Sequence, residues 1–406
     1  MKKLKKYIVF FVLFIIVFNI SVSAENYSVH NPFKTENTEN AESTTIDILA
    51  EIYNQINADG VRENMPEAAR EYLGPDAFGQ DENLNMADIS GKFSFGFIFN
   101  IVTKLLGSLI SAVVKNFIPV IAFIILSSVI GVLKNLHGND GKNNFSEILN
   151  FVLVLCLASA VFYNVRDCFY TAKNFLEDIH VYMMTMIPVM ASLSALSGNI
   201  SAAAANSTGL YVVLNVIEAM SSSIILPVLQ ICFALSFARQ ITASTDTVNL
   251  SGISSYMRSV LNWIFIFIMS ILTAVLLFQN ILASSADTVT ARTVKFTVTS
   301  FVPVVGSMIG DVSRTIMGSI QAVKSVTGIF GVFVIIITLL PPLITVVLNK
   351  FMLKISGAFA LILGLDRQAD FLKEMNSLLD ITVAVMVSAA VVFIFDITVF
   401  IKTVAA

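Results

Sequence analysis

Two carboxylates lie inside long apolar stretches of the sequence, where a charged side chain is costly. Glu218 lies within the stretch 210–238, and Asp396 lies within 378–401. Ionisable residues in such stretches bind ions or carry protons in many membrane proteins, although they also occur as neutral or hydrogen-bonded structural groups. Glu218 is the stronger functional candidate because more apolar sequence flanks it on both sides. Asp396 is close enough to Lys402 for an interfacial position.

Two segments that begin with a proline, Pro188 and Pro303, carry further candidate residues. Small residues at helical spacing let neighbouring helices approach closely, and polar residues on the same face can line a water-filled path. We favour packing, and both uses remain open. The three-residue spacing of Asp311 and Arg314 allows these two side chains to pair on one helix face. The candidates in the second segment are Gly306, Gly310, Asp311, Arg314 and Lys324.

Sequence motifs of common catalytic and metal-binding sites are absent. No G-x-x-x-x-G-K-[ST], H-E-x-x-H or G-x-S-x-G pattern occurs. The three histidines are scattered, and Cys156, Cys168 and Cys232 have no metal-ligand spacing. We therefore expect no enzymatic activity, no metal and no cofactor. Any energy source would be a gradient or a separate partner.

The elements that position these candidates must be membrane helices. Of the 406 residues, 56% are hydrophobic and 13% are charged, against roughly 25% charged residues in soluble domains. The net charge of −3 provides no basic surface for nucleic acid. Only helices and closed barrels satisfy their backbone in lipid, and these segments are too long and uniformly apolar for barrel strands. The composition predicts an all-α, multi-pass membrane bundle and excludes an ordinary soluble enzyme.

The first 92 residues divide into a signal-like segment and an acidic segment. Residues 1–24 contain four lysines, an apolar run and Ser-Val-Ser-Ala, which is the pattern of a signal peptide, with an uncleaved first helix as the alternative. Residues 25–92 hold fourteen acidic and four basic side chains, a net charge of −10. We expect residues 25–92 to be extracytoplasmic, as a solvated leader or as a docking segment for a partner.

Residues 93–115 have the pattern of an amphipathic helix. Apolar residues occupy one helical face, and polar and basic residues occupy the other. Such a helix lies in the membrane interface, or it forms the first half of a longer helix that continues through Pro119. The sequence supports both interpretations equally.

Residues 116–406 form the predicted multi-pass membrane domain, because they contain several apolar segments near the length of about 20 residues that a span requires. Segment 301–326 is apolar but interrupted, so it either crosses the membrane or re-enters. Positive charges divide evenly between the two sets of loops, so the orientation is not predicted. The candidate spans are 116–133, 146–165, 181–197, 210–238, 259–283, 327–348, 355–365 and 378–401.

An offset of 115 residues pairs Pro188 with Pro303 and Pro227 with Pro342, and so predicts an internal repeat. Duplicated membrane units with proline-broken segments are common in transporters. The two units are inverted if each crosses three times, and they are parallel if the proline-led segment only dips in and returns. The predicted units are residues 181–283 and 296–398.

A longer motif in the second unit resembles a known family. Residues 301–311 read Phe-Val-Pro-Val-Val-Gly-Ser-Met-Ile-Gly-Asp, and Val-Lys-Ser-Val-Thr-Gly and Leu-Pro-Pro-Leu follow at 323–328 and 340–343. Together with the signal-like start and the acidic leader, this pattern resembles the stage III sporulation protein AE family of endospore-forming Firmicutes. The resemblance covers most of the chain beyond about residue 40, and 302–306 and 324–328 are its most specific parts.

The resemblance implies a membrane subunit in the mother-cell membrane that surrounds the engulfed forespore. Its implied partners are other stage III A membrane proteins, including ring-forming and ATPase subunits, and a forespore protein across the intermembrane space. The implied assembly is a channel that permits late forespore transcription. The resemblance supplies no catalytic residue.

Two hypotheses from different functional classes therefore remain. The first is a non-enzymatic subunit of a sporulation channel or secretion-like complex, embedded in the lipid bilayer. The second is a self-contained secondary transporter built on two repeats, with Glu218 as a proton or ion site. A membrane scaffold without a pathway is a weaker third hypothesis.

Overall fold

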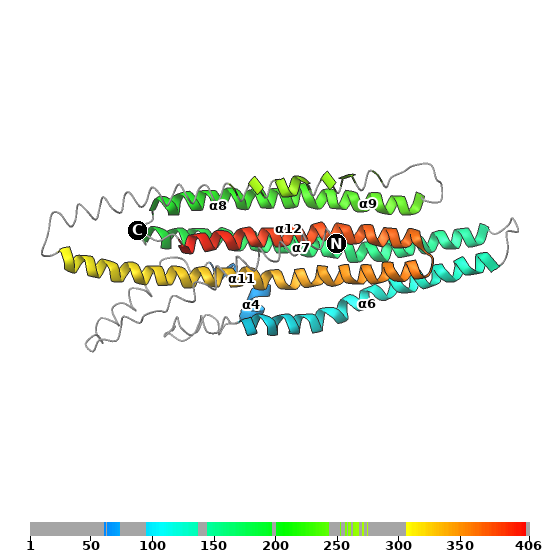
Figure 1. The fold of residues 1–406 in the computed structure, drawn as a ribbon, viewed down its shortest axis with the longest axis horizontal. Helices are drawn as coiled ribbons and strands as arrows, with labels where there is room; N and C mark the ends of the chain where they lie inside the picture. Colours follow the sequence, from blue (N-terminus) through cyan, green and yellow to red (C-terminus); the bar gives the residue numbers. More distant parts are fainter. Residues whose placement is uncertain are drawn as a thin grey trace.

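The described part of the chain is a bundle of long helices that run along one axis (Figure 1). The computed structural model describes residues 61, 63–73, 95–136, 144–196, 200–242 and 306–402, with scattered positions between 252 and 274. No strand occurs among these residues. The helices are α4 (Glu67–Leu73), α6 (Phe95–Leu136), α7 (Asn144–Leu196), α8 (Ile200–Met220), the π-helix η3 (Ser221–Ile225), α9 (Leu226–Thr242), α11 (Gly306–Ile362) and α12 (Asp366–Lys402).

The described helices include five that are long and apolar enough to cross a membrane. These apolar stretches are Ile98–Leu133, Ile148–Leu196, Ser207–Arg239, Val323–Ile362 and Asp366–Thr398. The protein is therefore an all-α, multi-pass membrane protein, as the composition predicted. The signal-like segment 1–24 and most of the acidic segment 25–92 lie outside the described residues.

The helices are longer than the spans that the sequence suggested. α7 has 53 residues and α11 has 57, which at 1.5 Å per residue corresponds to about 80 and 86 Å. A bilayer's hydrocarbon core is about 30 Å thick. The predicted span 146–165 and residues 181–196 of the span 181–197 lie in α7, and 327–348 and residues 355–362 of the span 355–365 lie in α11. The separation of these spans was wrong, because the helix backbone continues through the charged residues between them.

α6 likewise joins two predicted segments. It runs from Phe95 to Leu136 with Pro119 inside it, so residues 95–115 and the predicted span 116–133 form one helix. The amide of Asn164 in α7 donates a hydrogen bond to the carbonyl oxygen of Asn116 at 3.3 Å, three residues before the proline. This contact joins α6 to α7 near the position where proline interrupts the helical hydrogen bonds.

The prolines of the two predicted repeat units are accommodated differently. The π-helix η3 ends just before Pro227, and a π-bulge shifts the hydrogen-bond register so that a helix can pass such an interruption. In α11, Pro341 and Pro342 lie inside a continuous helix. Shifted by 115 residues, the run 200–242 falls on 315–357 within α11. The end of α7 has no counterpart break in α11, so the repeat stays a prediction.

A tight turn at Gly364 reverses the chain between α11 and α12. Gly364 has a φ of 71°, a left-handed conformation that glycine adopts without the steric cost of a side chain. The amide of Leu365 donates to the carbonyl of Ala360 at 2.9 Å, and that of Gly364 donates to Leu361 at 3.0 Å. These two bonds form a Schellman motif, which ends α11 and lets α12 pack against it.

α12 is the central helix of the bundle. It contacts α7, α8, α9 and α11. Within its most apolar window 67% of the residues are buried, against 28% for α6. Its side chains Leu372, Met386 and Phe393 are at most 2% exposed. Since lipid offers helices no hydrophobic drive to associate, this dense packing must hold the bundle together.

Candidate functional site: a polar seam between α7 and α8

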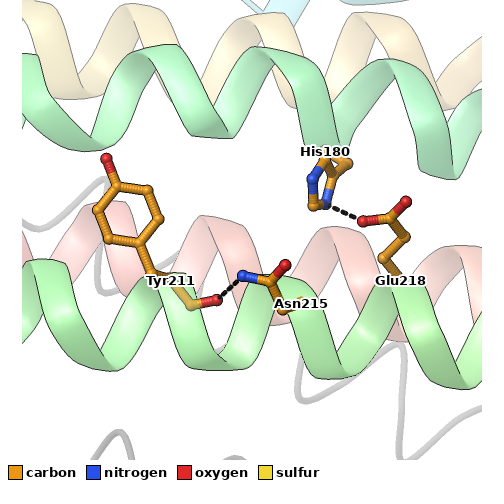
Figure 2. A network of polar contacts seen from close by, with 4 residues as sticks. All are labelled: His180, Tyr211, Asn215 and Glu218. Carbon is orange, nitrogen blue, oxygen red and sulfur yellow. Dashed lines mark hydrogen bonds and ion pairs between the residues drawn. The ribbon is translucent and has the colours of Figure 1, made fainter.

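Glu218, the carboxylate predicted as a functional group, lies opposite a histidine of the preceding helix. Oε2 of Glu218 in α8 is 3.0 Å from Nδ1 of His180 in α7 (Figure 2). The contact has the distance of an ion pair if the histidine is protonated, but it is not aligned as a hydrogen bond. The Glu218 side chain is 43% exposed and that of His180 is 17% exposed. The pair therefore lies at the edge of the bundle.

Other polar residues of α8 continue the same stripe. Thr208, Tyr211, Asn215 and Glu218 are spaced three or four residues apart, so they share one helical face. The amide of Asn215 donates to the carbonyl of Tyr211 at 2.6 Å, and the hydroxyl of Thr208 donates to Ala204 at 2.9 Å. Figure 2 shows Tyr211, Asn215 and Glu218 on the side of α8 that faces α7. We call His180, Thr208, Tyr211, Asn215 and Glu218 the α7–α8 seam.

The opposite face of α8 is apolar and packs into the core. Leu210, Val213, Leu214 and Ile217 are at most 3% exposed. Thr208 and Asn215 are exposed, and Tyr211 and Glu218 are partly exposed. α8 therefore has a buried apolar face, and the seam lies along its exposed edge beside α7, next to the exposed side chain of Val212.

Charged pairs of a different kind join the central helix to its neighbours. Arg239 of α9 pairs with Glu374 of α12, and Lys350 of α11 pairs with Asp380 of α12 at 2.5 Å. Lys350 and Glu374 are each 14% exposed. Neither pair, nor the contact of His180 with Glu218, could be predicted from the sequence, because these partners lie far apart in it and no local pattern connects them.

Asp396 and Lys324, the other ionisable candidates inside apolar sequence, are both buried. Asp396 of α12 is 2% exposed, and its Oδ2 has no hydrogen-bond partner among the described residues. Lys324 of α11 is 0% exposed. The amide of Gln321, one turn before Lys324, donates to the carbonyl of Ile401 at 3.1 Å, so this face of α11 meets the C-terminal end of α12.

Two glycines of α11 that were not among the predicted packing candidates, Gly328 and Gly331, make close helix contacts, whereas Gly318 faces open space. A Cβ on Gly331 would lie 2.8 Å from Cε of Met186 and 3.2 Å from Cδ1 of Ile397, and one on Gly328 would overlap Ile401. These glycines follow the candidates Gly306 and Gly310, which the structure places in the first turns of α11. The motif Lys324-x-x-x-Gly328 thus lies at the contact between α11 and α12.

The remaining candidates are less fully described. Pro188 lies inside α7 and is exposed, and its carbonyl accepts a hydrogen bond from Ser192 at 2.9 Å. Asp311 and Arg314 lie in α11, where their side chains are outside the described residues, as is Pro303. Within the described part of the chain, no group of His, Cys, Asp and Glu side chains is arranged to hold a metal ion.

The long apolar helices, packed on a buried central helix, define a multi-pass helical membrane protein. The chain belongs to the stage III sporulation protein AE family, which matches residues 83–404. The stage III sporulation protein AE of Bacillus subtilis (strain 168) is 23% identical over 280 residues, which cover 67% of this chain and 65% of the relative. The matched part is thus slightly less than two thirds of the relative's length. No solved structure matches the chain.

Proposed function

We propose that the protein is a non-enzymatic membrane subunit of a sporulation channel or secretion-like complex that links mother cell and forespore. Membership of a stage III sporulation family supports the sporulation role. In this proposal it lies in the mother-cell membrane around the forespore. Its partners are other stage III A membrane proteins, including ring-forming and ATPase subunits, and a forespore protein. The acidic segment 25–92 would face the intermembrane space.

The location of the polar seam residues favours a subunit of an assembly over a self-contained carrier. Large side chains such as Tyr182, Met186 and Phe393 fill the centre of the bundle and are at most 2% exposed. The polar residues of the α7–α8 seam lie on the outside instead. A chain with a filled core and an outer polar face needs neighbours to enclose a pathway, which supports a role within an assembly.

Deletion of the gene in its spore-forming host tests this proposal. We expect arrest after engulfment, with a late forespore reporter silent, and recovery of both when the intact gene is returned. Co-purification from the complemented strain should then recover other stage III A proteins. Normal spores and an active reporter in the deletion strain would contradict the proposal.

A self-contained secondary transporter is the alternative, and the His180–Glu218 contact inside a span supports it. The purified protein in liposomes would then catalyse gradient-driven flux without any partner. Glu218→Gln, which keeps the shape of the side chain and removes its charge, should abolish that coupled flux. A liposome experiment without flux, together with sporulation arrest in the deletion strain, favours the channel subunit.

A further inference from the structure

The α7–α8 seam differs from the neighbouring outer surfaces of the bundle in a way that indicates what covers it. We propose that the seam is in contact with water inside the membrane. It forms one wall of a path for water and small polar solutes, whose other walls lie outside this bundle. This inference rests on the proposed channel role and extends it to named residues.

Residues at the same level of the bundle allow the comparison. The His180–Glu218 contact places Val181 of α7 near Glu218 of α8, and Gly331 of α11 lies beside Met186 of α7. From His180 toward the C-terminal end of α7, the large exposed side chains are apolar: Val181 is 49% exposed and Met184 40%, and Ile329 of α11 is 42% exposed. In the turn before His180, Glu177 and Asp178 are exposed and charged, so the apolar outer surface of α7 begins only after His180. On α8 the exposed residues near this level are Thr208, Val212, Asn215 and Ala219; Val212 is 53% exposed, and the polar side chains Thr208 and Asn215 flank it.

Lipid is a poor neighbour for this part of α8. A charged residue at the centre of a membrane helix costs at least about 2.5–3.5 kcal/mol on insertion scales, and Glu218 has 43% of its side chain outside the bundle. Asn215 uses one N–H donor on the carbonyl of Tyr211. Its other donor and its carbonyl oxygen have no partner among the described residues. Val181 and Met184 carry no such cost.

Water fits the seam better than a dry protein surface does. Nδ1 of His180 is buried and lacks an aligned hydrogen bond, although Glu218 is only 3.0 Å away. Water can donate to the carboxylate and to the Asn215 carbonyl, and it can accept from the amide. A dry interface would have to supply all of these partners in fixed positions, because an unmatched buried polar group is costly. The seam's mixed donors and acceptors are typical of a wetted surface.

Cysteine accessibility in native membranes tests this inference on the full chain. Cys156, Cys168 and Cys232 are first replaced by alanine, and sporulation of the host shows that this background folds and functions. Single cysteines are then introduced as Thr208→Cys and Asn215→Cys. Membranes are treated with a charged, membrane-impermeant methanethiosulfonate, and the unreacted thiols are counted with a maleimide-polyethylene glycol after denaturation.

Matched controls for Asn215→Cys lie near its level, on outer faces that we assign to lipid. They are Val181→Cys, Met184→Cys and Ile329→Cys. Water ionises a thiol and admits the charged reagent, and hydrocarbon does neither, so we expect the seam positions to react at least about tenfold faster than the controls. Each variant must also complement the deletion, which shows that the reactive thiol belongs to a folded protein.

Three outcomes would overturn the inference. Equally slow reaction at all positions would show that lipid, a partner or residues 243–305 of this chain cover the seam. Equally fast reaction would place this whole level outside the membrane. Disulfide-linked dimers of Asn215→Cys, without modification by the reagent, would show a dry contact between two copies.

The outcomes also separate this inference from the proposed function. If the deletion strain arrests but the seam cysteines do not react, the water-lined wall is contradicted and the sporulation function still holds. If the seam cysteines react but the deletion strain sporulates normally, the sporulation function is contradicted. The wetted surface would then support the transporter alternative.

Discussion

The polar side chains of α12 and α8 occupy opposite environments. On α12, Glu374 and Asp380 point into the bundle and meet basic side chains of α9 and α11. On α8, Asn215 and Glu218 lie at the outer edge, and Glu218 is nearly half exposed. The inward pairs hold neighbouring helices in register, whereas the outward groups remain accessible. Changes on α12 should therefore alter stability, and changes on α8 should alter function with little loss of stability.

Removal of one inward charge should produce the largest loss of stability. Lys350→Met leaves the Asp380 carboxylate without its cation at a site where the two side chains are 14% and 27% exposed. Breaking a fully buried pair costs about 3–5 kcal/mol, and the partial exposure of Asp380 reduces the expected loss to about 2–3 kcal/mol. The melting temperature of the detergent-solubilised protein should fall by several degrees.

Two further variants show whether the orphaned carboxylate causes that loss. Lys115→Met removes an exposed cation of α6 and should leave the melting temperature unchanged. Lys350→Met combined with Asp380→Leu removes both charges and should recover most of the stability. A double variant as unstable as the single one would show that the lysine acts through packing rather than charge.

Overfilling the contact between α11 and α12 should have the next largest effect. Gly328→Val would place a branched side chain against Ile401, whereas Gly318→Val on the same helix enters open space. Both variants make the same change in helix propensity, so the difference between their melting temperatures reports the contact of residue 328 with Ile401. Overpacking costs about 1–3 kcal/mol, and thermal unfolding in detergent should show this loss at Gly328 alone. Equal melting temperatures would mean that α12 can move away from α11 without cost.

The fold class could be predicted from the sequence, but the lengths of the helices could not. Hydropathy identifies apolar stretches and stops at charges such as Arg166 and Lys173 in the middle of α7. The helix does not stop there, because its hydrogen bonds depend on the backbone and not on side-chain polarity. For the same reason α11 was predicted as separate spans. Its helix also continues through Pro341 and Pro342.

The candidate site could be predicted only in part. Glu218 was found because a carboxylate inside an apolar stretch is a local signal. Its partner His180 is on another helix, and only the antiparallel packing of α7 on α8 brings the two together. The pair of Arg239 and Glu374 spans 135 residues, a separation at which sequence spacing carries no information. Long-range pairing in a bundle is set by helix register, which a single sequence does not reveal.

Neutralising the seam carboxylate should change stability very little. The contact of Glu218 with His180 is partly exposed, and such pairs contribute about 0–1 kcal/mol. Glu218→Gln should therefore shift the melting temperature by less than Lys350→Met does. In the host we expect the late forespore reporter to stay active, because a channel wall needs a polar group at this position rather than a titrating one. A silent reporter with a normally folded protein would favour the transporter alternative.

A change of polarity at Asn215 should leave stability almost unaltered and still impair function. Asn215→Leu places an apolar side chain on an exposed position, so no core contact is lost, and the protein should melt at the same temperature or slightly higher. If the seam is wetted, leucine removes its hydrogen-bonding groups and the late forespore reporter should weaken. Asn215→Ser is the matched control, since serine is smaller but still polar and should keep the reporter active. Equal reporter activity in both variants would mean that the polarity of the seam has no functional consequence, and the contrast between α8 and α12 would then be one of packing alone.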